Sequence, residues 1–453
     1  MRRGDRFEMT ADELDDAGQG VGQVAEHRVH VADLLPGESG DVLVEHVSPH
    51  RPEAWARLMT PMGATSPDRV TPACPAFGAC GGCAWQALAY PAQLARKRAR
   101  VRAALAGFAE LEAIVPSPAE LGYRNKGKYV IARAEDGRVI LGAYLPRSHQ
   151  VVDTAGCHVV EPVIDRLARE LARRLTASGL APHDERLGTG VLRHAVIRTG
   201  AAGRALICLV TTSSARPSEL LPIAEALVAD PEVAGVSWAE NDRPGGAIFD
   251  SRAAPPTTLA GDATVPEPLF GVEVALDATS FLQINRAQAH RMYADLAALT
   301  GAGEHTRAVD LYCGLGGIAF ALAAAGAAVT GIEVHEPAVL AASASARAAG
   351  LEPRVQFHTG RAADLPALAS DADLLVVNPP RKGLDAETRA AVLALAPATI
   401  AYVSCNPDSL VRDLAAFTAD GYRIERARAY DLMPGTAQIE TLVICRRSAA
   451  SDP

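Results

Sequence analysis

Strand-like and helix-like segments alternate regularly between residues 308 and 419, and this pattern constrains the fold more than any other part of the chain. Such an alternation predicts a parallel, doubly wound sheet with helices on both faces. Two further apolar runs follow with little helix between them, so we expect an antiparallel hairpin to complete the sheet. The expected strands are 308–312, 328–333, 355–359, 373–377, 399–404, 422–430 and 439–446, and the expected helices are 317–325, 337–349, 386–395 and 409–419.

Glycines follow the first of these strands in the pattern Asp310-x-x-x-Gly314-x-Gly316. Ligands of doubly wound sheets bind at the carboxyl ends of the strands, where glycines let the backbone approach a cofactor closely. Glu333 ends the second strand, about 20 residues further on, where a carboxylate can hold both hydroxyls of a ribose. Asp364, after the third strand, is expected near an adenine. No lysine follows the glycines, which argues against a phosphate-binding loop, and the pattern indicates S-adenosylmethionine.

Asn378-Pro379-Pro380 follows the fourth strand, and Cys405 follows the fifth. The prolines restrict the backbone and hold a polar side chain at the cleft. A cysteine at the cleft suits one methyl transfer in particular, that to carbon 5 of uracil. Carbon 5 is too weakly nucleophilic to accept a methyl group directly. Addition of a thiolate to carbon 6 makes an enolate, and carbon 5 of this enolate can attack the methyl group. A base must then remove the proton from carbon 5. Glu440, which enters the last apolar strand, is the candidate base because burial raises the pKa of a carboxyl group.

Each of these residues has a plainer alternative. Taken alone, Cys405 is a buried strand cysteine, and Glu440 is a surface residue of an edge strand. Gln283 and Asn285 carry amides that can read the edge of a planar polar ring. They could instead make local backbone hydrogen bonds where a helix begins. Thr279 or Ser280 is expected to cap that helix.

Three of the eight cysteines, Cys74, Cys80 and Cys83, have C-x5-C-x2-C spacing with glycines among them. Three thiolates at this spacing can surround one soft metal centre, and the best candidate for a fourth ligand is Cys157. Zinc and a [4Fe–4S] cluster both accept four cysteines, so the spacing leaves the choice open. Unrelated structural cysteines are the third alternative.

The organisation expected for the whole chain is a multidomain α/β protein. Residues 1–60 show short strand-like runs between glycine and proline turns, which is typical of a small β-barrel. Residues 61–276 form an α+β region, mostly sheet, with strands that include 247–249 and 270–276. A basic helix over 86–106 could pack on the last domain, which spans residues 277–453 and has a Rossmann-like sheet.

The net charge of −9 argues weakly against a general nucleic-acid coat. The run Arg96-Lys97-Arg98-Ala-Arg100-Val-Arg102 is nevertheless strongly basic and can contact an RNA backbone, the alternative being a solvated helix face. The sequence contains no run of about 18 uncharged apolar residues, so we do not expect a membrane-spanning helix. The first residues lack a signal-peptide pattern, so we expect a cytoplasmic location. We also expect a monomer.

Together the motifs resemble the RNA 5-methyluridine methyltransferase family from about Phe7 to Ile444. The resemblance implies Cys405 as nucleophile and Glu440 as general base. It also implies S-adenosylmethionine as cofactor and selects a [4Fe–4S] cluster over zinc. The motifs that carry it are Cys74, Cys80, Cys83 and Cys157; Ser280-Phe-Leu-Gln283-Ile-Asn285; Asp310-Leu-Tyr-Cys-Gly314; Asn378-Pro-Pro-Arg381-Lys-Gly383; Ser404-Cys405-Asn406-Pro407; and Glu440.

The same resemblance implies that Gln283, Tyr312, Glu333 and Asn378 are cofactor or cleft residues. Residues 1–60 resemble a TRAM domain, an RNA-binding barrel, through Gly18-Gln-Gly20-Val, His30-Val31 and Leu35-Pro36-Gly37-Glu38. A TRAM domain together with a cluster is typical of the branch that modifies 23S ribosomal RNA, and transfer RNA is the alternative substrate.

Two residues depart from the usual pattern of the family. Asn378 replaces an aspartate, and Gln438 replaces a histidine two residues before Glu440. Other functions fit the sequence less well. RNA cytosine-5 methyltransferases place a cysteine directly after the proline pair, where this chain has Arg381. A non-catalytic iron–sulfur RNA-binding factor would not need the glycine turn together with Cys405 and Glu440.

Overall fold

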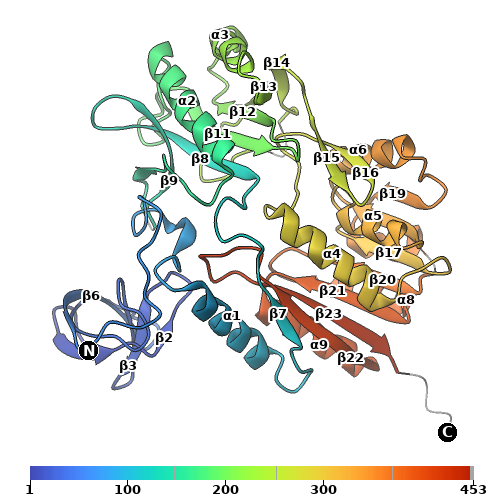
Figure 1. Cartoon of the computed structure of the whole chain (residues 1–453), viewed down its shortest axis with the longest axis horizontal. Helices are drawn as coiled ribbons and strands as arrows, with labels where there is room; N and C mark the ends of the chain where they lie inside the picture. Colours follow the sequence, from blue (N-terminus) through green and yellow to red (C-terminus); the bar gives the residue numbers. More distant parts are fainter. Residues whose placement is uncertain (147, 251–252, 370, 449–453) are drawn as a thin grey trace.

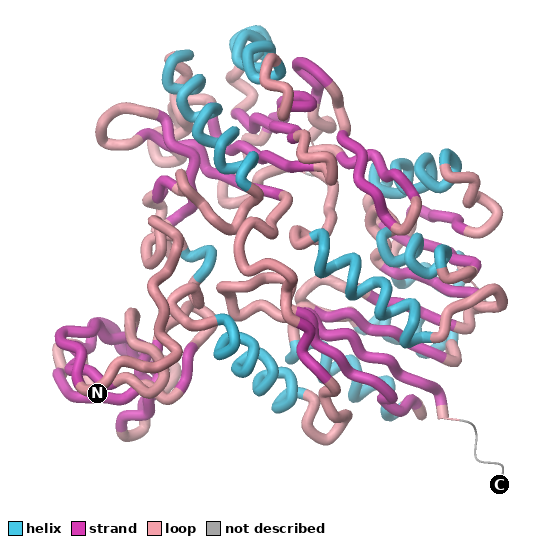
Figure 2. The backbone as a smooth tube through the Cα atoms, viewed as in Figure 1, coloured by secondary structure: helices cyan, strands magenta, loops and turns pink. Residues whose placement is uncertain are grey.

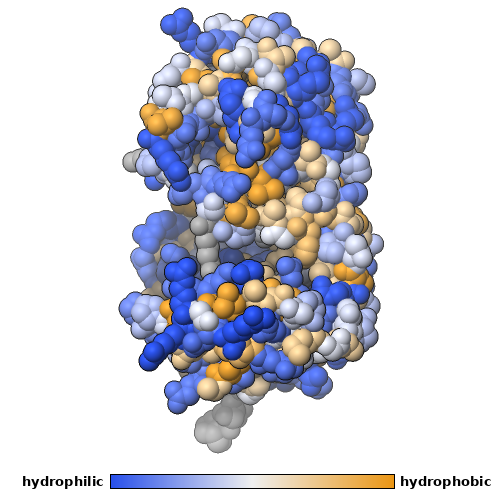
Figure 3. All heavy atoms as spheres, turned by 90° about the vertical axis from the view of Figure 1, so that its left-hand side faces the viewer, coloured by the Kyte–Doolittle hydropathy of each residue, from blue (hydrophilic) through white to orange (hydrophobic). Residues whose placement is uncertain are grey.

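The computed structural model describes residues 1–146, 148–250, 253–369 and 371–448 of the chain. Three strand-rich parts follow one another along the sequence and surround a central region of loops, as Figures 1 and 2 show. The face seen in Figure 3 is mainly hydrophilic, with apolar residues gathered in small areas. None of the described helices is long and apolar enough to cross a membrane.

The N-terminal part is a six-stranded sheet that surrounds its own apolar core. Inward and outward residues alternate along its strands, so one side carries buried residues such as Val29, Val42 and Val44. The sheet order is β1-β5-β6-β4-β3-β2. The strands are β1 (Arg6–Thr10), β2 (Glu13–Leu14), β3 (Gly20–Val24), β4 (His27–Val31), β5 (Ser39–Val47) and β6 (Glu53–Met62).

A mixed seven-stranded sheet forms the second part. Its order is β10-β9-β8-β11-β12-β13-β14, and helices α2 (Pro162–Ser178) and α3 (Pro217–Val228) pack on one face through a shared apolar core. A separate hairpin of β15 (Val265–Leu269) and β16 (Val272–Leu276) leads into the last part. The strands of the sheet are β8 (Lys126–Arg133), β9 (Val139–Tyr144), β10 (Val151–Asp153), β11 (Leu192–Thr199), β12 (Ala205–Thr211), β13 (Val233–Glu240) and β14 (Thr257–Gly261).

The last part is an eight-stranded sheet with the order β19-β18-β17-β20-β21-β23-β22-β7. Its first five strands are parallel, and β23 runs antiparallel to both β21 and β22, so the predicted doubly wound sheet with a final hairpin is confirmed. The strands are β7 (Ala113–Val115), β17 (Arg307–Leu311), β18 (Ala328–Glu333), β19 (Val355–Thr359), β20 (Leu374–Val377), β21 (Thr399–Ser404), β22 (Tyr422–Tyr430) and β23 (Glu440–Arg447).

Helices cover both faces of this sheet because alternate strand residues point to opposite sides. Along β21, Ala401 and Val403 join one apolar core, whereas Ile400 and Tyr402 join the other. The first core includes residues of α4 (Arg286–Thr300), α5 (Gly317–Ala324) and α6 (Glu336–Ala348). The second includes residues of α1 (Tyr90–Ala104), α7 (Leu365–Leu368), α8 (Ala386–Leu395) and α9 (Pro407–Ala419).

Several details differ from the sequence prediction. The outer edge of the eight-stranded sheet is β7, a short strand from the middle of the chain that pairs in parallel with β22. The strand predicted at 247–249 is not formed, because the carbonyl groups of Ala247 and Ile248 accept hydrogen bonds of 2.6 and 3.0 Å from the Asn241 side chain. The strand predicted at 270–276 is confirmed as β16, and it pairs with β15, which was not predicted.

The basic helix is shorter than the predicted 86–106 and packs against α9, on the last part of the chain. It is also less free to bind RNA than its sequence suggested. Lys97 is completely buried, and Arg100 donates a hydrogen bond of 3.0 Å to Asp16 in the N-terminal part. Arg98 and Arg102 remain exposed.

Arg286, the first residue of α4, connects the second part of the molecule to the last. Its guanidinium group lies 2.7 Å from a Glu161 oxygen and 2.6 Å from a Glu267 oxygen, and it donates to the Thr199 carbonyl at 3.1 Å. The Glu267 side chain is fully buried, so this ion pair supplies the partner that a buried carboxylate needs.

Replacing Arg286 with methionine is expected to lower the free energy of unfolding by about 3 kcal/mol, because the Glu267 carboxylate then stays buried without its partner. Urea denaturation of the variant and the wild-type protein measures this difference. Arg291→Met is the matched control, since Arg291 lies exposed on the same helix. Equal losses in the two variants would contradict the structural role of Arg286.

Candidate active site

A cavity of about 890 Å³ opens beside the carboxyl ends of the parallel strands. Segments far apart in the sequence contribute to its wall. All but one of the predicted catalytic and cofactor-binding residues lie there, namely Gln283, Tyr312, Gly314, Glu333, Asn378, Cys405 and Glu440.

The turn after β21 holds Cys405 at the wall of the cavity. The Ser404 hydroxyl donates to the carbonyl of Asn406 at 2.9 Å and accepts from its amide N–H at 3.1 Å. The Asn406 side chain caps α9 by accepting from the Asp408 N–H at 3.2 Å, and it donates to the Arg381 carbonyl at 3.1 Å. One asparagine therefore connects the cysteine turn to the loop that contains the proline pair.

The environment of Cys405 favours the thiol over the thiolate. Burial raises its pKa, the negative charge of Glu440 raises it further, and the positive charge of Arg381 acts in the opposite direction. Because only the thiolate form of a cysteine is a strong nucleophile, the raised pKa favours the less reactive form of Cys405.

Glu440 begins β23 and is only 7% exposed. Burial raises the pKa of its carboxyl group to about 8, and Arg381 limits the rise. Its Oε2 atom is buried and accepts no hydrogen bond from the part of the chain that the structure describes. A carboxylate with a pKa near the working pH, and without a competing partner, suits a general base.

The glycine turn after β17 has the backbone form that close approach to a cofactor requires. Tyr312 and Gly314 have φ values of 63° and 53°, and a non-glycine residue rarely takes such a conformation. Glu333 stabilises the turn by accepting hydrogen bonds from the N–H groups of Gly314 at 3.2 Å and His335 at 2.9 Å. Its carboxylate also faces the cavity, so it is placed to hold hydroxyl groups of a ligand.

Gln283 and Asn285 have different roles in the structure. Gln283 lines the cavity, whereas Asn285 caps α4 by accepting from the Gln288 N–H and donates to the Ser117 hydroxyl at 3.0 Å and the Leu432 carbonyl at 3.2 Å. Asn285 thus makes the hydrogen bonds of a helix entry, and neither Thr279 nor Ser280 caps the helix as predicted.

Asp364 is the predicted cofactor residue that does not line the cavity. Its carboxylate closes a short 3₁₀ turn, Ala362–Asp364, by accepting from the Arg361 N–H at 2.9 Å. Two further cavity residues were not predicted from the sequence. Phe281, 72% exposed, and Val334, 67% exposed, place apolar side chains at the cavity wall. An aromatic residue between Ser280 and Gln283 was the available signal for the first of these.

The four candidate metal ligands lie around a second, smaller cavity. Cys74, Cys80, Cys83 and Cys157 all line a space of about 230 Å³, together with the basic residues Arg124, Lys126 and Lys128. Burial raises the pKa of Cys83 to about 12. Over residues 1–146, 148–250, 253–369 and 371–448, no three His, Cys, Asp or Glu side chains are placed to hold a single metal ion.

Comparison with known proteins agrees with the site. The family model of tRNA (uracil-5-)-methyltransferases matches residues 356–448, and a general methyltransferase-domain model matches residues 308–397. An uncharacterized RNA methyltransferase of Listeria monocytogenes is 32% identical over 98% of each chain. Another, from Gloeobacter violaceus, is 34% identical over 95% of this chain and 94% of its own.

A solved structure shows the same fold. The tRNA (uracil-54, C5)-methyltransferase of Pyrococcus abyssi, in complex with S-adenosyl-L-homocysteine, has a TM-score of 0.76 and 23% identity, covering 97% of this chain and 100% of its own. The sheet and the cavity at its strand ends define an S-adenosylmethionine-dependent methyltransferase. With relatives of this similarity along nearly its whole length, the chain belongs to the RNA 5-methyluridine methyltransferase family, which confirms the resemblance seen in the sequence.

The raised pKa of Glu440 predicts a specific pH dependence of stability. Between the unfolded value of about 4.3 and the folded value of about 8, the folded state keeps a proton that the unfolded chain releases. The free energy of unfolding should therefore fall as the pH rises through this range, by up to about 1.4 kcal/mol per pH unit. Glu440→Gln should remove this contribution, as measured by urea denaturation at several pH values.

Glu273→Gln is the matched control, because Glu273 is an exposed glutamate on β16. It should leave the pH profile unchanged. A Glu440→Gln profile parallel to that of the wild-type protein would contradict the raised pKa.

Proposed function

We propose that the protein methylates carbon 5 of a uridine in RNA through a covalent bond between Cys405 and carbon 6 of the base. One observation carries the proposal. Cys405 and Glu440 line the same cavity as the turn residue Gly314 and the carboxylate of Glu333. A nucleophile, a base and a cofactor turn in one cavity are the groups that this reaction needs.

The Cys405 thiolate adds to carbon 6 of the uracil, and the electron pair of the carbon 5–carbon 6 double bond becomes an enolate. When bound, S-adenosylmethionine would supply an electrophilic methyl group for carbon 5 and would be left as S-adenosylhomocysteine once its bond between sulfur and the methyl carbon breaks. The Glu440 carboxylate then takes the proton from carbon 5. The bond between sulfur and carbon 6 breaks as the double bond re-forms, and Cys405 returns as the thiolate. A uracil inside an RNA helix must leave its stack to reach these groups.

The cavity fits the adenosyl cofactor at its glycine-turn side. Glu333 would hold the ribose hydroxyls, and Gly314 lets the backbone approach. Gln283, Tyr312 and Asn378 line the same cavity. The exposed ring of Phe281 offers a surface on which a base can stack.

For the substrate we propose 23S ribosomal RNA. The support is the likeness of residues 1–60 to a TRAM domain, joined in one chain to four cysteines around one cavity. Residues 1–60 would then bind RNA, residues 61–276 would hold the cysteine centre and residues 277–453 the methyltransferase site. Transfer RNA is the second candidate, because it is the substrate named for the Pyrococcus abyssi enzyme.

We also propose that Cys74, Cys80, Cys83 and Cys157 hold a [4Fe–4S] cluster. In such a cluster each thiolate binds a different iron, so the four sulfur atoms do not need to surround one ion. This requirement is compatible with four cysteines that share a cavity and lack a single-ion arrangement. The basic residues around the cavity would offset the negative charge of a four-thiolate cluster. A single zinc ion is less compatible with the same arrangement.

Cys405→Ala is expected to abolish methylation and to leave S-adenosylmethionine binding near normal, because the thiol is needed for chemistry alone. RNA that contains 5-fluorouridine provides the direct measurement, since its fluorine blocks proton removal and traps the covalent adduct. The wild-type protein should give a denaturant-resistant adduct that depends on S-adenosylmethionine. Cys208→Ala is the control, because Cys208 is buried in β12. No adduct between wild-type protein and any cellular RNA would refute the mechanism.

Cys80→Ser is expected to remove the brown colour and the absorbance near about 400 nm that cysteine-ligated clusters show. Iron and sulfide analysis of anaerobically purified protein measures the loss. Cys313→Ser is a suitable control because Cys313 lies in the glycine turn, away from the cysteine cavity. Wild-type protein that contains stoichiometric zinc and no iron would refute the cluster.

A further inference from the structure

Residues 431–439, which we call the β22–β23 loop, connect the last two strands and form one wall of the catalytic cavity. The loop leads directly into Glu440. Pairing with Tyr430 of β22 positions the backbone of Glu440, and the loop lines the same cavity as the Glu440 side chain. Four loop residues line the cavity: Leu432, Met433, Gln438 and Ile439.

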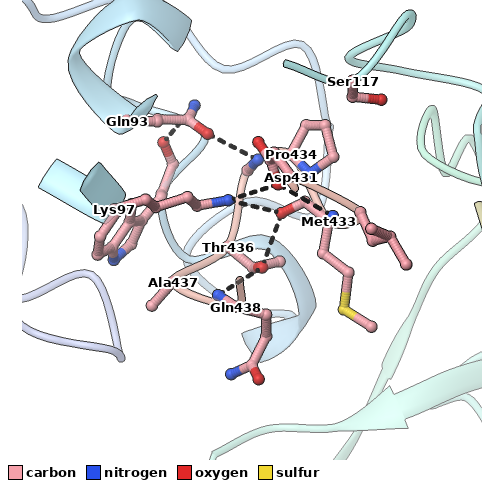
Figure 4. A network of polar contacts seen from close by, with 12 residues as sticks. Gln93, Lys97, Ser117, Asp431, Met433, Pro434, Thr436, Ala437 and Gln438 are labelled. Carbon is pink, nitrogen blue, oxygen red and sulfur yellow. Dashed lines mark hydrogen bonds and ion pairs between the residues drawn. The ribbon is translucent and has the colours of Figure 1, made fainter. Parts of the chain in front are cut away.

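A buried lysine from a distant helix holds the start of this loop. Lys97 on α1 donates from Nζ to the Asp431 carboxylate at 2.8 Å and to the Met433 carbonyl at 3.1 Å, as Figure 4 shows. The same Asp431 oxygen accepts from the Met433 N–H at 3.0 Å. The side chains of Lys97 and Asp431 are both 0% exposed.

A glutamine one helical turn earlier holds the tip of the loop. Gln93 accepts a hydrogen bond of 2.8 Å from the Gly435 N–H through its Oε1 atom (Figure 4). Its Nε2 atom donates to the carbonyl groups of Trp85 at 3.2 Å and Leu88 at 2.8 Å, which fixes the amide orientation. Residues four apart lie on the same side of a helix, so Gln93 and Lys97 both form hydrogen bonds with the loop.

Hydrogen bonds inside the loop connect these contacts to the residues just before Glu440. The Met433 carbonyl that accepts from Lys97 also accepts from the Thr436 hydroxyl at 2.8 Å. The Thr436 hydroxyl in turn accepts from the Gln438 N–H at 3.1 Å. A continuous series of contacts thus runs from Lys97 to the residue two positions before Glu440 (Figure 4).

Stability alone does not account for a buried ion pair here. Two well-packed apolar side chains often stabilise a protein as much as a buried pair of charges, because desolvation offsets the attraction between the charges. A buried ion pair that also makes directed hydrogen bonds differs from apolar packing, because it forms in only one geometry. Lys97 and Asp431 therefore specify the path of the loop more than they add to the stability of the fold.

We propose that Lys97 and Gln93 are positioning residues that hold the β22–β23 loop, and through it the Glu440 carboxylate, in the place required for proton removal. The inference rests on the proposed role of Glu440 as base. Neither residue lines the catalytic cavity, so both act through the loop. Lys97 belongs to a basic run that the sequence suggested as an RNA contact. It is buried instead and supports the reaction through the loop.

The test follows the covalent adduct on ordinary uridine-containing RNA. If the carboxylate is displaced, carbon 5 keeps its proton, the bond between Cys405 and carbon 6 persists, and the methylated adduct accumulates. Lys97→Met should lower the turnover rate by about tenfold or more, which is part of the roughly 10² to 10⁴ that a positioned base contributes. A denaturant-resistant adduct should appear, and S-adenosylmethionine binding should not change.

Arg291→Met is the matched control, because it removes one exposed positive charge from α4, outside the basic run and outside the cavity lining. It should turn over without adduct accumulation. Gln93→Met, which keeps both charges of the ion pair, should also accumulate adduct. Turnover of Lys97→Met equal to that of Arg291→Met would overturn the proposal, as would a loss of turnover without any adduct.

The double variant Lys97→Met/Asp431→Asn separates positioning from the effect of an unpaired buried charge. It should regain thermal stability relative to Lys97→Met and keep the low turnover and the adduct. Full recovery of turnover would overturn the proposal. Glu440→Gln is the reference for the chemistry. If it accumulates no adduct, the assignment of the base fails; if it does and Lys97→Met does not, only the positioning role fails.

Discussion

The high free energy of a buried, unpaired charge governs the arrangement of the catalytic part. Two buried charges have partners: Lys97 meets Asp431, which is 334 positions away in the sequence, and Glu267 meets Arg286. Glu440 lacks such a partner, since no described group satisfies its Oε2 atom, and burial raises its pKa; the buried Asp310 carboxyl group is in the same state. A carboxyl group in this state destabilises the fold but keeps an affinity for a proton. The Lys97–Asp431 pair contacts the loop that lines the cavity of Glu440.

The sequence was most informative where a local pattern determines a position in space. The alternation of strands and helices defines a parallel sheet, and the ends of parallel strands must meet at one edge. Gly314, Glu333, Asn378 and Cys405 each follow such a strand, so their approach to one another could be predicted without a structure. Glu440 could be added because it begins the antiparallel strand that pairs with the Cys405 strand. Topology, not side-chain detail, explains this success.

Contacts without a local signal could not be predicted. β7 is three residues long, and only its pairing with β22 makes it a strand. Lys97 belongs to a run of basic residues, and nothing in that run distinguishes the one that faces a distant aspartate. Asp364 lies beyond the end of β19, and a tight turn directs its carboxylate to the N–H of Arg361. For β7 and Lys97 the decisive partner lies far away in the chain, whereas for Asp364 it is a local turn.

The two departures from the family pattern act on the same electrostatic balance. A carboxylate at position 378 would add a negative charge to the cavity that holds Cys405 and Glu440, and like charges raise the pKa of both groups. Asn378 avoids this and keeps a hydrogen-bonding side chain at the wall. Gln438 has no titratable group, so position 438 adds no charge to the cavity wall. Arg381 opposes the rise in the pKa of both Cys405 and Glu440.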